Sequence, residues 1–129
     1  MYRTSLLALL IAVAAGPAAA TGEVYCEAPG ASGAVFSYGF GSVPGIALVN
    51  ATIRAEGQRW SLIEADGAIP MSLAQASLEN RRTLIDFADP NMERIVASVR
   101  LLSAVEGDDT VTVGTLHIPG TGVFPLLCD

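Results

Sequence analysis

The segment IVASVRLLSAVEGDDTVTVGTLHI, residues 95–118, decides the fold. Apolar and polar residues alternate along its first half, which places two kinds of side chain on opposite faces of a strand: Ile95, Ala97, Val99 and Leu101 against Arg94, Ser98 and Arg100. The run Glu106–Asp109 then supplies turn residues. Thr110–Ile118 follows and is rich in valine and threonine, which suit a pleated, half-buried surface. The pattern predicts two antiparallel strands joined by a short turn.

A helix is the alternative for the first half of this segment. Asp89-Pro90 could be an N-cap followed by proline at the first helical position, and Gly107 could be the stop. Several apolar residues also fall at helical spacing: Met92, Ile95, Val96, Val99 and Leu102. We favour the strand because the segment is rich in β-branched residues, which lose side-chain freedom in a helix. Short Gly/Asp and Pro/Gly breaks also recur on its far side at hairpin spacing.

A short closing strand, Val123–Cys128, follows the break at residues 119–122 and ends on a cysteine. The only other cysteine is Cys26, near the start of the predicted domain. A bridge between Cys26 and Cys128 would close a loop of about 100 residues, which in the chain-entropy model contributes up to roughly 4–5 kcal/mol. We therefore predict one structural disulfide that ties both ends of the domain together. The pair has no C-x-x-C spacing, which argues against a redox-active site.

The rest of the chain contains more short runs with strand alternation, separated by Gly, Pro, Asp and Asn. The predicted strands are Glu23–Glu27, Ala34–Phe40, Ile46–Glu56, Arg59–Glu64 and Thr83–Ala88. Residues 68–80 are ambiguous, because Ile69, Met71 and Leu73 alternate as in a strand whereas Ser72 could cap a short helix over residues 72–79. The sequence predicts an all-β fold, an antiparallel β-sandwich or small barrel of seven or eight short strands.

Residues 1–20 have the pattern of a cleaved signal peptide. Arg3 is the positive n-region, Leu6–Ala15 is the apolar h-region, and Ala18-Ala19-Ala20 is an A-x-A cleavage site. The apolar run is shorter than the roughly 20 residues that a membrane span needs. We expect cleavage near Ala20, export to the periplasm or the medium, and a single soluble domain over residues 21–129.

The charge of the expected mature chain is strongly negative. Six arginines, no lysine and thirteen carboxylates remain after Arg3 is removed, giving a net charge of about −7. Such a surface repels phosphate backbones, so we expect no nucleic-acid partner. A basic partner is compatible with it. We also expect a monomer and no cofactor.

Four aromatic residues are candidate ligand-binding groups. Phe36, Tyr38 and Phe40 share one face of a predicted strand, and Trp60 is the only tryptophan. Aromatic rings can line an apolar or sugar-binding cavity. The competing interpretation is that the row forms the core wall of its strand and that Trp60 is a core anchor.

Two other groups of residues could carry chemistry. Asp89, Asn91 and Glu93, with Asp86 nearby, offer oxygen ligands at alternate positions, as a calcium loop does. The glycine and the distal bidentate glutamate of such a loop are missing, and turn formation alone explains Asp, Pro and Asn here. His117 is the only histidine, and a serine hydrolase would need it beside a hydroxyl and a carboxylate. No G-x-S-x-G motif is present, so we assign no catalytic residue.

Two functional hypotheses follow from these patterns. The first is a non-catalytic exported module that binds a protein or cell-envelope component through an exposed face or an unpaired sheet edge. An inhibitor of a basic secreted enzyme is one version of it. The alternative is a small-ligand-binding sandwich or barrel with a cavity lined by Phe36, Tyr38, Phe40 and Trp60. A filled core with an apolar surface patch would favour the first hypothesis, and an aromatic-lined cavity the second.

Overall fold

The computed structural model describes residues 22–30, 32–41 and 47–129, and this part of the chain consists of strands, turns and loops without a helix. The predicted signal peptide, its cleavage site and residues 42–46, at the start of the predicted strand Ile46–Glu56 and just before it, lie outside the described residues. The strands are β1 (Gly22–Glu27), β2 (Val35–Phe40), β3 (Leu48–Ala55), β4 (Gln58–Ser61), β5 (Ile69–Pro70), β6 (Ser72–Glu79), β7 (Arg82–Ala88), β8 (Ile95–Glu106), β9 (Asp109–Ile118) and β10 (Gly122–Cys128).

The all-β prediction is confirmed. The strand interpretation of the segment that begins at Ile95 is confirmed as well, since it forms β8. The predicted number of strands is wrong, because the described residues form ten strands and not seven or eight. The difference lies in the ambiguous region, where residues 69–70 and 72–79 form β5 and β6. The short helix considered for residues 72–79 is therefore wrong. Pairing with β7 through a two-residue turn overrides the local preference of this alanine- and leucine-containing stretch.

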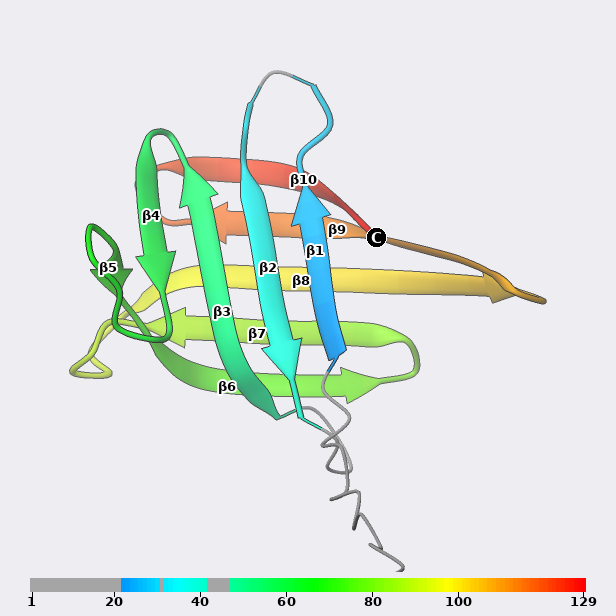
Figure 1. The fold of residues 1–129 in the computed structure, drawn as a ribbon, viewed down its shortest axis with the longest axis horizontal. Coiled ribbons are helices and arrows are strands. Elements are labelled where there is room, and N and C mark those ends of the chain that lie inside the picture. Colours follow the sequence, from blue (N-terminus) through cyan, green and yellow to red (C-terminus); the bar gives the residue numbers. More distant parts are fainter. Residues whose placement is uncertain (1–21, 31, 42–46) are drawn as a thin grey trace, which may run out of the picture.

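All ten strands belong to one sheet, in the order β5-β4-β3-β2-β1-β10-β9-β8-β7-β6. Every neighbouring pair is antiparallel except β4 and β5, which are parallel. Figure 1 shows that the sheet folds into two layers, with β1–β4 crossing β6–β10 at a steep angle. The two end strands, β5 and β6, are not hydrogen-bonded to each other in this order. The result is a nearly closed, barrel-like sheet.

The core lies between the two layers and is filled by large apolar side chains. Phe36 of β2 and Phe87 of β7 meet across it, with ring centroids 6.1 Å apart in an edge-to-face arrangement. Both rings are fully buried, and so are further aliphatic side chains from both layers: Ile53, Ile85, Val99 and Leu116. The alternation read in residues 97–101 is confirmed, since Ala97, Val99 and Leu101 all face this core. Ile95 is 42% exposed, because the register between β7 and β8 shifts next to it.

The seam between the two layers is short. β1 and β10 share only two paired positions, Cys26 with Cys128 and Glu27 with Leu127. One further hydrogen bond runs from the Asp129 backbone N–H to the Tyr25 carbonyl oxygen, at 2.9 Å. The predicted disulfide between Cys26 and Cys128 is confirmed and lies within the first of the two pairs. It therefore fixes the register of the seam covalently.

Two tight turns and one glycine shape the layer that contains β6–β9. Asn80 and Arg81 both have positive φ, of 49° and 62°, which makes the β6–β7 connection a type I′ turn. The β8–β9 connection turns at Gly107, with a φ of 59°. In the middle of β9, a Cβ at Gly114 would lie 1.8 Å from the Arg100 carbonyl oxygen, so only glycine allows the observed approach of β9 to β8.

Reducing the disulfide should destabilise the domain strongly. The disulfide holds β1 and β10 together, although the ladder between these strands has only two paired positions. A Cys26→Ser/Cys128→Ser double variant should lose about 2–4 kcal/mol of unfolding free energy, measured by urea denaturation. An unfolding midpoint equal to that of the oxidised wild type would contradict this role.

Replacing Arg81 by glycine should stabilise the domain. A non-glycine residue in the left-handed region costs roughly 1 kcal/mol, and Asn-Gly is the preferred type I′ pair. Greater freedom of glycine in the unfolded chain offsets part of the gain, so we expect Arg81→Gly to add about 0.5 kcal/mol in urea denaturation. Arg82→Ala is the control, because it removes a neighbouring arginine that has ordinary φ. A lower midpoint for Arg81→Gly than for wild type would rule out strain at this turn.

Candidate functional site

Among the cavities formed by the described residues, those beside Tyr38 and Trp60 divide the candidate aromatic residues between them. Phe36 is buried in the filled core, and its ring stacks on that of Tyr38 with centroids 5.4 Å apart. Tyr38 and Phe40 border a cavity at one end of the two layers. Trp60 borders a different cavity. Phe36, Tyr38 and Trp60 are 0%, 6% and 7% exposed, which is the burial that the core-wall interpretation expects.

The cavity beside Tyr38, called the Tyr38 cavity below, has a volume of about 270 Å³. Its apolar walls are Val24, Phe40, Leu78 and Leu101, and its polar groups include the hydroxyls of Tyr38, Thr83, Ser103 and Thr112. The Ser103 and Thr112 hydroxyls are 2.6 Å apart and hydrogen-bonded to each other. Burial raises the pKa of the Tyr38 phenol, while its hydrogen bond with the Thr83 side chain opposes that effect. Asp129 also lines the cavity, so its polar lining combines four hydroxyls with one acidic residue.

The cavity beside Trp60 is larger, at about 390 Å³, and carries charge at its rim. Trp60, Ile69 and Ile95 supply apolar surface, and Asp89 and Arg94 lie beside them. The Asp89 carboxylate accepts hydrogen bonds from the backbone N–H groups of Glu93 at 2.8 Å and Arg94 at 2.9 Å. These bonds, the one from Arg94 first, hold the pKa of Asp89 below its usual value.

The calcium hypothesis rested on Asp86, Asp89, Asn91 and Glu93, and the structure gives two of these residues other partners. Asp89 holds the backbone of its own loop, and Asp86 belongs to a separate network on β7. Within residues 22–30, 32–41 and 47–129, no group of three or more His, Cys, Asp or Glu residues could hold a metal ion. The metal site remains a prediction that no observed contact supports.

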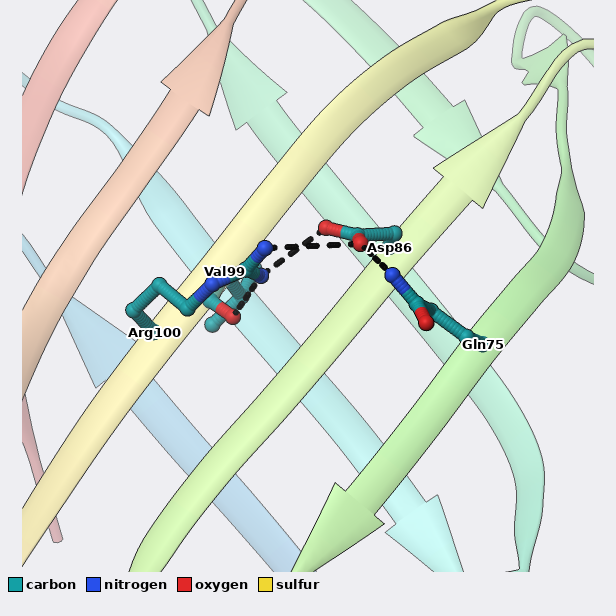
Figure 2. A network of polar contacts seen from close by, with 4 residues as sticks. All are labelled: Gln75, Asp86, Val99 and Arg100. Atoms are coloured by element: carbon teal, nitrogen blue, oxygen red, sulfur yellow. Dashed lines mark hydrogen bonds and ion pairs between the residues drawn. The ribbon is translucent and has the colours of Figure 1, made fainter.

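The strongest polar network of the described residues centres on Asp86, whose carboxylate is almost fully buried although it lies on the outer face of β7. Figure 2 shows the Arg100 guanidinium of β8 on one side of this carboxylate and the Gln75 amide of β6 on the other. Arg100 Nη1 donates to Asp86 Oδ1 at 2.8 Å and to the Val99 carbonyl oxygen at 2.9 Å. The network therefore links three adjacent strands.

The pKa of Asp86 is lowered by its partners. Burial alone would raise it, but hydrogen bonds from Arg100, Gln75 and Ser98, together with the positive charge of Arg100, outweigh that effect. Because the carboxylate already has several donors, it has little capacity left for a substrate. We assign this network a structural role.

His117 lies in the same cross-strand row as this network. It pairs with Ser98 of β8, and Ser98 pairs with Asp86 of β7, so the three side chains share the outer face. The order differs from that of a catalytic triad, in which the imidazole lies between the hydroxyl and the carboxylate. Here Ser98, on β8, lies between Asp86 on β7 and His117 on β9. None of the cavities beside Tyr38 and Trp60 reaches these residues.

An exposed apolar row crosses the outer face of β8, β9 and β10. Leu102, Val113 and Leu127 are direct cross-strand neighbours, and they are 51%, 43% and 50% exposed. Val111, 55% exposed, lies one row further along β9. We call these four residues the apolar row. Sequence reasoning missed the apolar row. The adjacent residues Leu101 and Leu102 were the available signal, because consecutive strand residues point to opposite faces and both are large and apolar.

Carboxylates border the apolar row on two sides. Glu27 of β1 pairs with Leu127 at one end, and the exposed β8–β9 turn carries Glu106, Asp108 and Asp109. Arg82 pairs with Leu102 at the opposite end, and the half-exposed Arg100 lies two residues from Leu102 on the same face of β8. Figure 1 shows that the β8–β9 hairpin extends beyond the neighbouring strands, which brings the acidic turn to the tip of a projecting arm. The row is therefore an apolar strip with a predominantly acidic border.

The fold and these surfaces define an all-β domain with a nearly closed, disulfide-joined sheet; the disulfide indicates an oxidising compartment such as export provides. No family model, curated protein or solved structure matches this chain. Among the described residues, none belongs to a helix with the length and apolarity required to cross a membrane.

Substituting Asp86 should reveal the structural role of its network. Asp86→Asn removes the charge but keeps the shape, and it should lower the unfolding free energy by about 1–3 kcal/mol at pH 7. The folded-state pKa is lowered, so the stabilisation is complete above the unfolded-state value of about 3.9 and is lost as the pH falls through the folded-state value. Urea denaturation should therefore show the two proteins converging as the pH falls through the lowered folded-state pKa of Asp86. Glu64→Gln, at an exposed loop carboxylate, is the control. A difference that is independent of pH would contradict an ionic contribution.

Proposed function

We propose that this chain is an exported, non-catalytic module that binds a basic protein partner through the apolar row and its acidic border. The carrying observation is that three adjacent strands present Leu102, Val113 and Leu127 side by side, each about half exposed. The core between the layers is already filled, so these side chains are not needed for it. An exposed, continuous apolar strip is a common feature of protein-binding surfaces.

The size of the row limits how much affinity it can supply. Fully burying one valine or leucine contributes about 1.5–3 kcal/mol, so the four half-exposed side chains of the row retain about 3–6 kcal/mol at most. Additional affinity and orientation would come from charge. Four carboxylates border the row, at Glu27, Glu106, Asp108 and Asp109, whereas Arg82 is the arginine paired with it. A partner with apolar anchors surrounded by lysine or arginine matches this arrangement. A basic secreted enzyme inhibited by this domain is one such partner.

The test compares two glutamate substitutions on β9. Val113→Glu places a charge in the apolar row, and Thr115→Glu places the same charge on the same face two residues away. Both positions are exposed, so Val113→Glu should keep its stability within about 0.5 kcal/mol. Thr115 pairs with Arg100, so Thr115→Glu places its carboxylate opposite that guanidinium, and its stability is measured before its binding. The tagged proteins are used to capture partners from the exported fraction of the source, and the recovered partner is then titrated calorimetrically. We expect Val113→Glu to weaken binding at least tenfold, and Thr115→Glu less than twofold.

Salt dependence provides a second readout. Exposed charges are screened over about 8 Å at physiological ionic strength, so association should slow as NaCl is raised from 50 to 500 mM. A partner that binds Val113→Glu as tightly as wild type, or whose association rate is independent of salt, would refute the proposal. Capture of a cell-envelope component in place of a protein would show that the class of partner proposed here is wrong, although the apolar row would still be the binding surface.

Small-ligand binding is the second candidate, and the Tyr38 cavity is the observation that favours it. Only two of the four predicted aromatic residues, Tyr38 and Phe40, border this cavity. Native mass spectrometry of the protein from its own source distinguishes the two functions. A retained small molecule that is lost in Leu101→Trp, designed to fill the cavity, would favour the ligand. A protein that retains no small molecule, together with a protein partner whose association slows at high salt, would favour binding through the apolar row.

A further inference from the structure

The two edges of the sheet are protected very differently. β5, at one edge, has only two residues and ends on Pro70, which has no N–H to donate. β6, at the other edge, runs for eight residues, and its ladder pairs it only with β7. It contains no proline or lysine, and Glu79 at its end is its only charge. The register shift near Leu73 bends its first part, which leaves residues 75–79 as a regular open edge among the described strands.

The type I′ turn determines which backbone groups of β6 point outward. In a two-residue hairpin the flanking residues, Glu79 and Arg82, form the hydrogen-bonded pair that closes the turn. Bonded and non-bonded pairs alternate along an antiparallel ladder, so Ser77 is bonded to β7 whereas Ala76 and Leu78 are not. The N–H and C=O groups of Ala76 and Leu78 therefore point away from β7, toward the free edge.

The side chain of Leu78 faces an unfilled space. Leu78 pairs with Thr83, which pairs with the buried Leu101, so Leu78 lies on the core-facing side of its layer. It is nevertheless 53% exposed and lines the Tyr38 cavity together with Phe40. Paired residues of neighbouring strands point to the same face of a sheet. A strand added to β6 would therefore direct the side chains opposite Ala76 and Leu78 to the side on which this cavity opens.

We propose that the free edge of β6 binds an extended polypeptide segment, which adds antiparallel to β6 as an eleventh strand. The segment would exchange backbone hydrogen bonds with Ala76 and Leu78, and the residues opposite these two would be apolar. The residue opposite Ser77 faces solvent near Glu79, which favours a polar or basic side chain there. The edge lies on β6 and the apolar row lies on β8–β10, so this inference does not rest on the proposed function.

A capped synthetic peptide tests the proposal, with valine at alternate positions, threonine between them and lysine at both ends. Titrated into the ¹⁵N-labelled, disulfide-intact domain, it should shift the amide signals of Ala76 and Leu78 most and slow their hydrogen exchange. Ala76→Pro removes one outward N–H without breaking a bond to β7, and it should weaken binding at least tenfold. Ala76→Ser keeps the N–H and should change binding less than twofold.

A second comparison leaves the protein unchanged, in case Ala76→Pro does not fold. N-methylation of the valines should abolish binding, because their N–H groups face β6, whereas N-methylation of the threonines should leave it intact. Equal binding of the two methylated peptides, or shifts confined to the apolar row, would overturn the proposal. Concentration-dependent dimerisation that Ala76→Pro prevents, without binding of the peptide, would also overturn it, because the occupant would then be a second copy of this chain.

Discussion

The disulfide between Cys26 and Cys128 is the constraint on which the shape of the molecule depends. The two layers are continuous in sequence between β5 and β6, but those strands do not pair, so β1 and β10 supply the hydrogen-bonded connection on the other side. That connection has only two paired positions, and the disulfide lies in one of them. Because the bond fixes the seam, the layers stay close enough for Phe36 and Phe87 to meet and fill the core.

A filled core changes what the surfaces can do. The largest fully buried side chains, Phe36 and Phe87 among them, pack against one another in the interior, so recognition is left to the outer surface and to the Tyr38 cavity. The apolar row and the β6 edge lie at different places on the layer formed by β6–β10, and they would bind a partner through different interactions. The first offers aliphatic side chains bordered by carboxylates, and the second offers backbone hydrogen bonds. The Asp86 network lies between them and ties β6, β7 and β8 together.

Local patterns predicted the elements whose alternation is strong, such as residues 95–118, and the two cysteines left one possible disulfide. The state of residues 72–79 could not be predicted, because Ser-Leu-Ala-Gln-Ala-Ser-Leu-Glu suits a helix as well as a strand, and Arg81 gives no sign of adopting positive φ. The candidate site was harder still. Whether Trp60 and Tyr38 share a cavity depends on how the sheet bends, and the apolar row exists only in the register of three strands. Both are non-local properties that one-dimensional periodicity does not contain.

The short, proline-ended β5 has a consequence for stoichiometry. Polymerisation by strand addition requires two open edges on each molecule, one to accept a strand and one to offer a template for the next. This sheet has a long edge at β6 and only a two-residue edge at β5. Strand addition therefore ends after one event, and the expected product is a finite complex of one domain with one segment. The asymmetry lets the chain keep an accessible edge without forming fibrils through it.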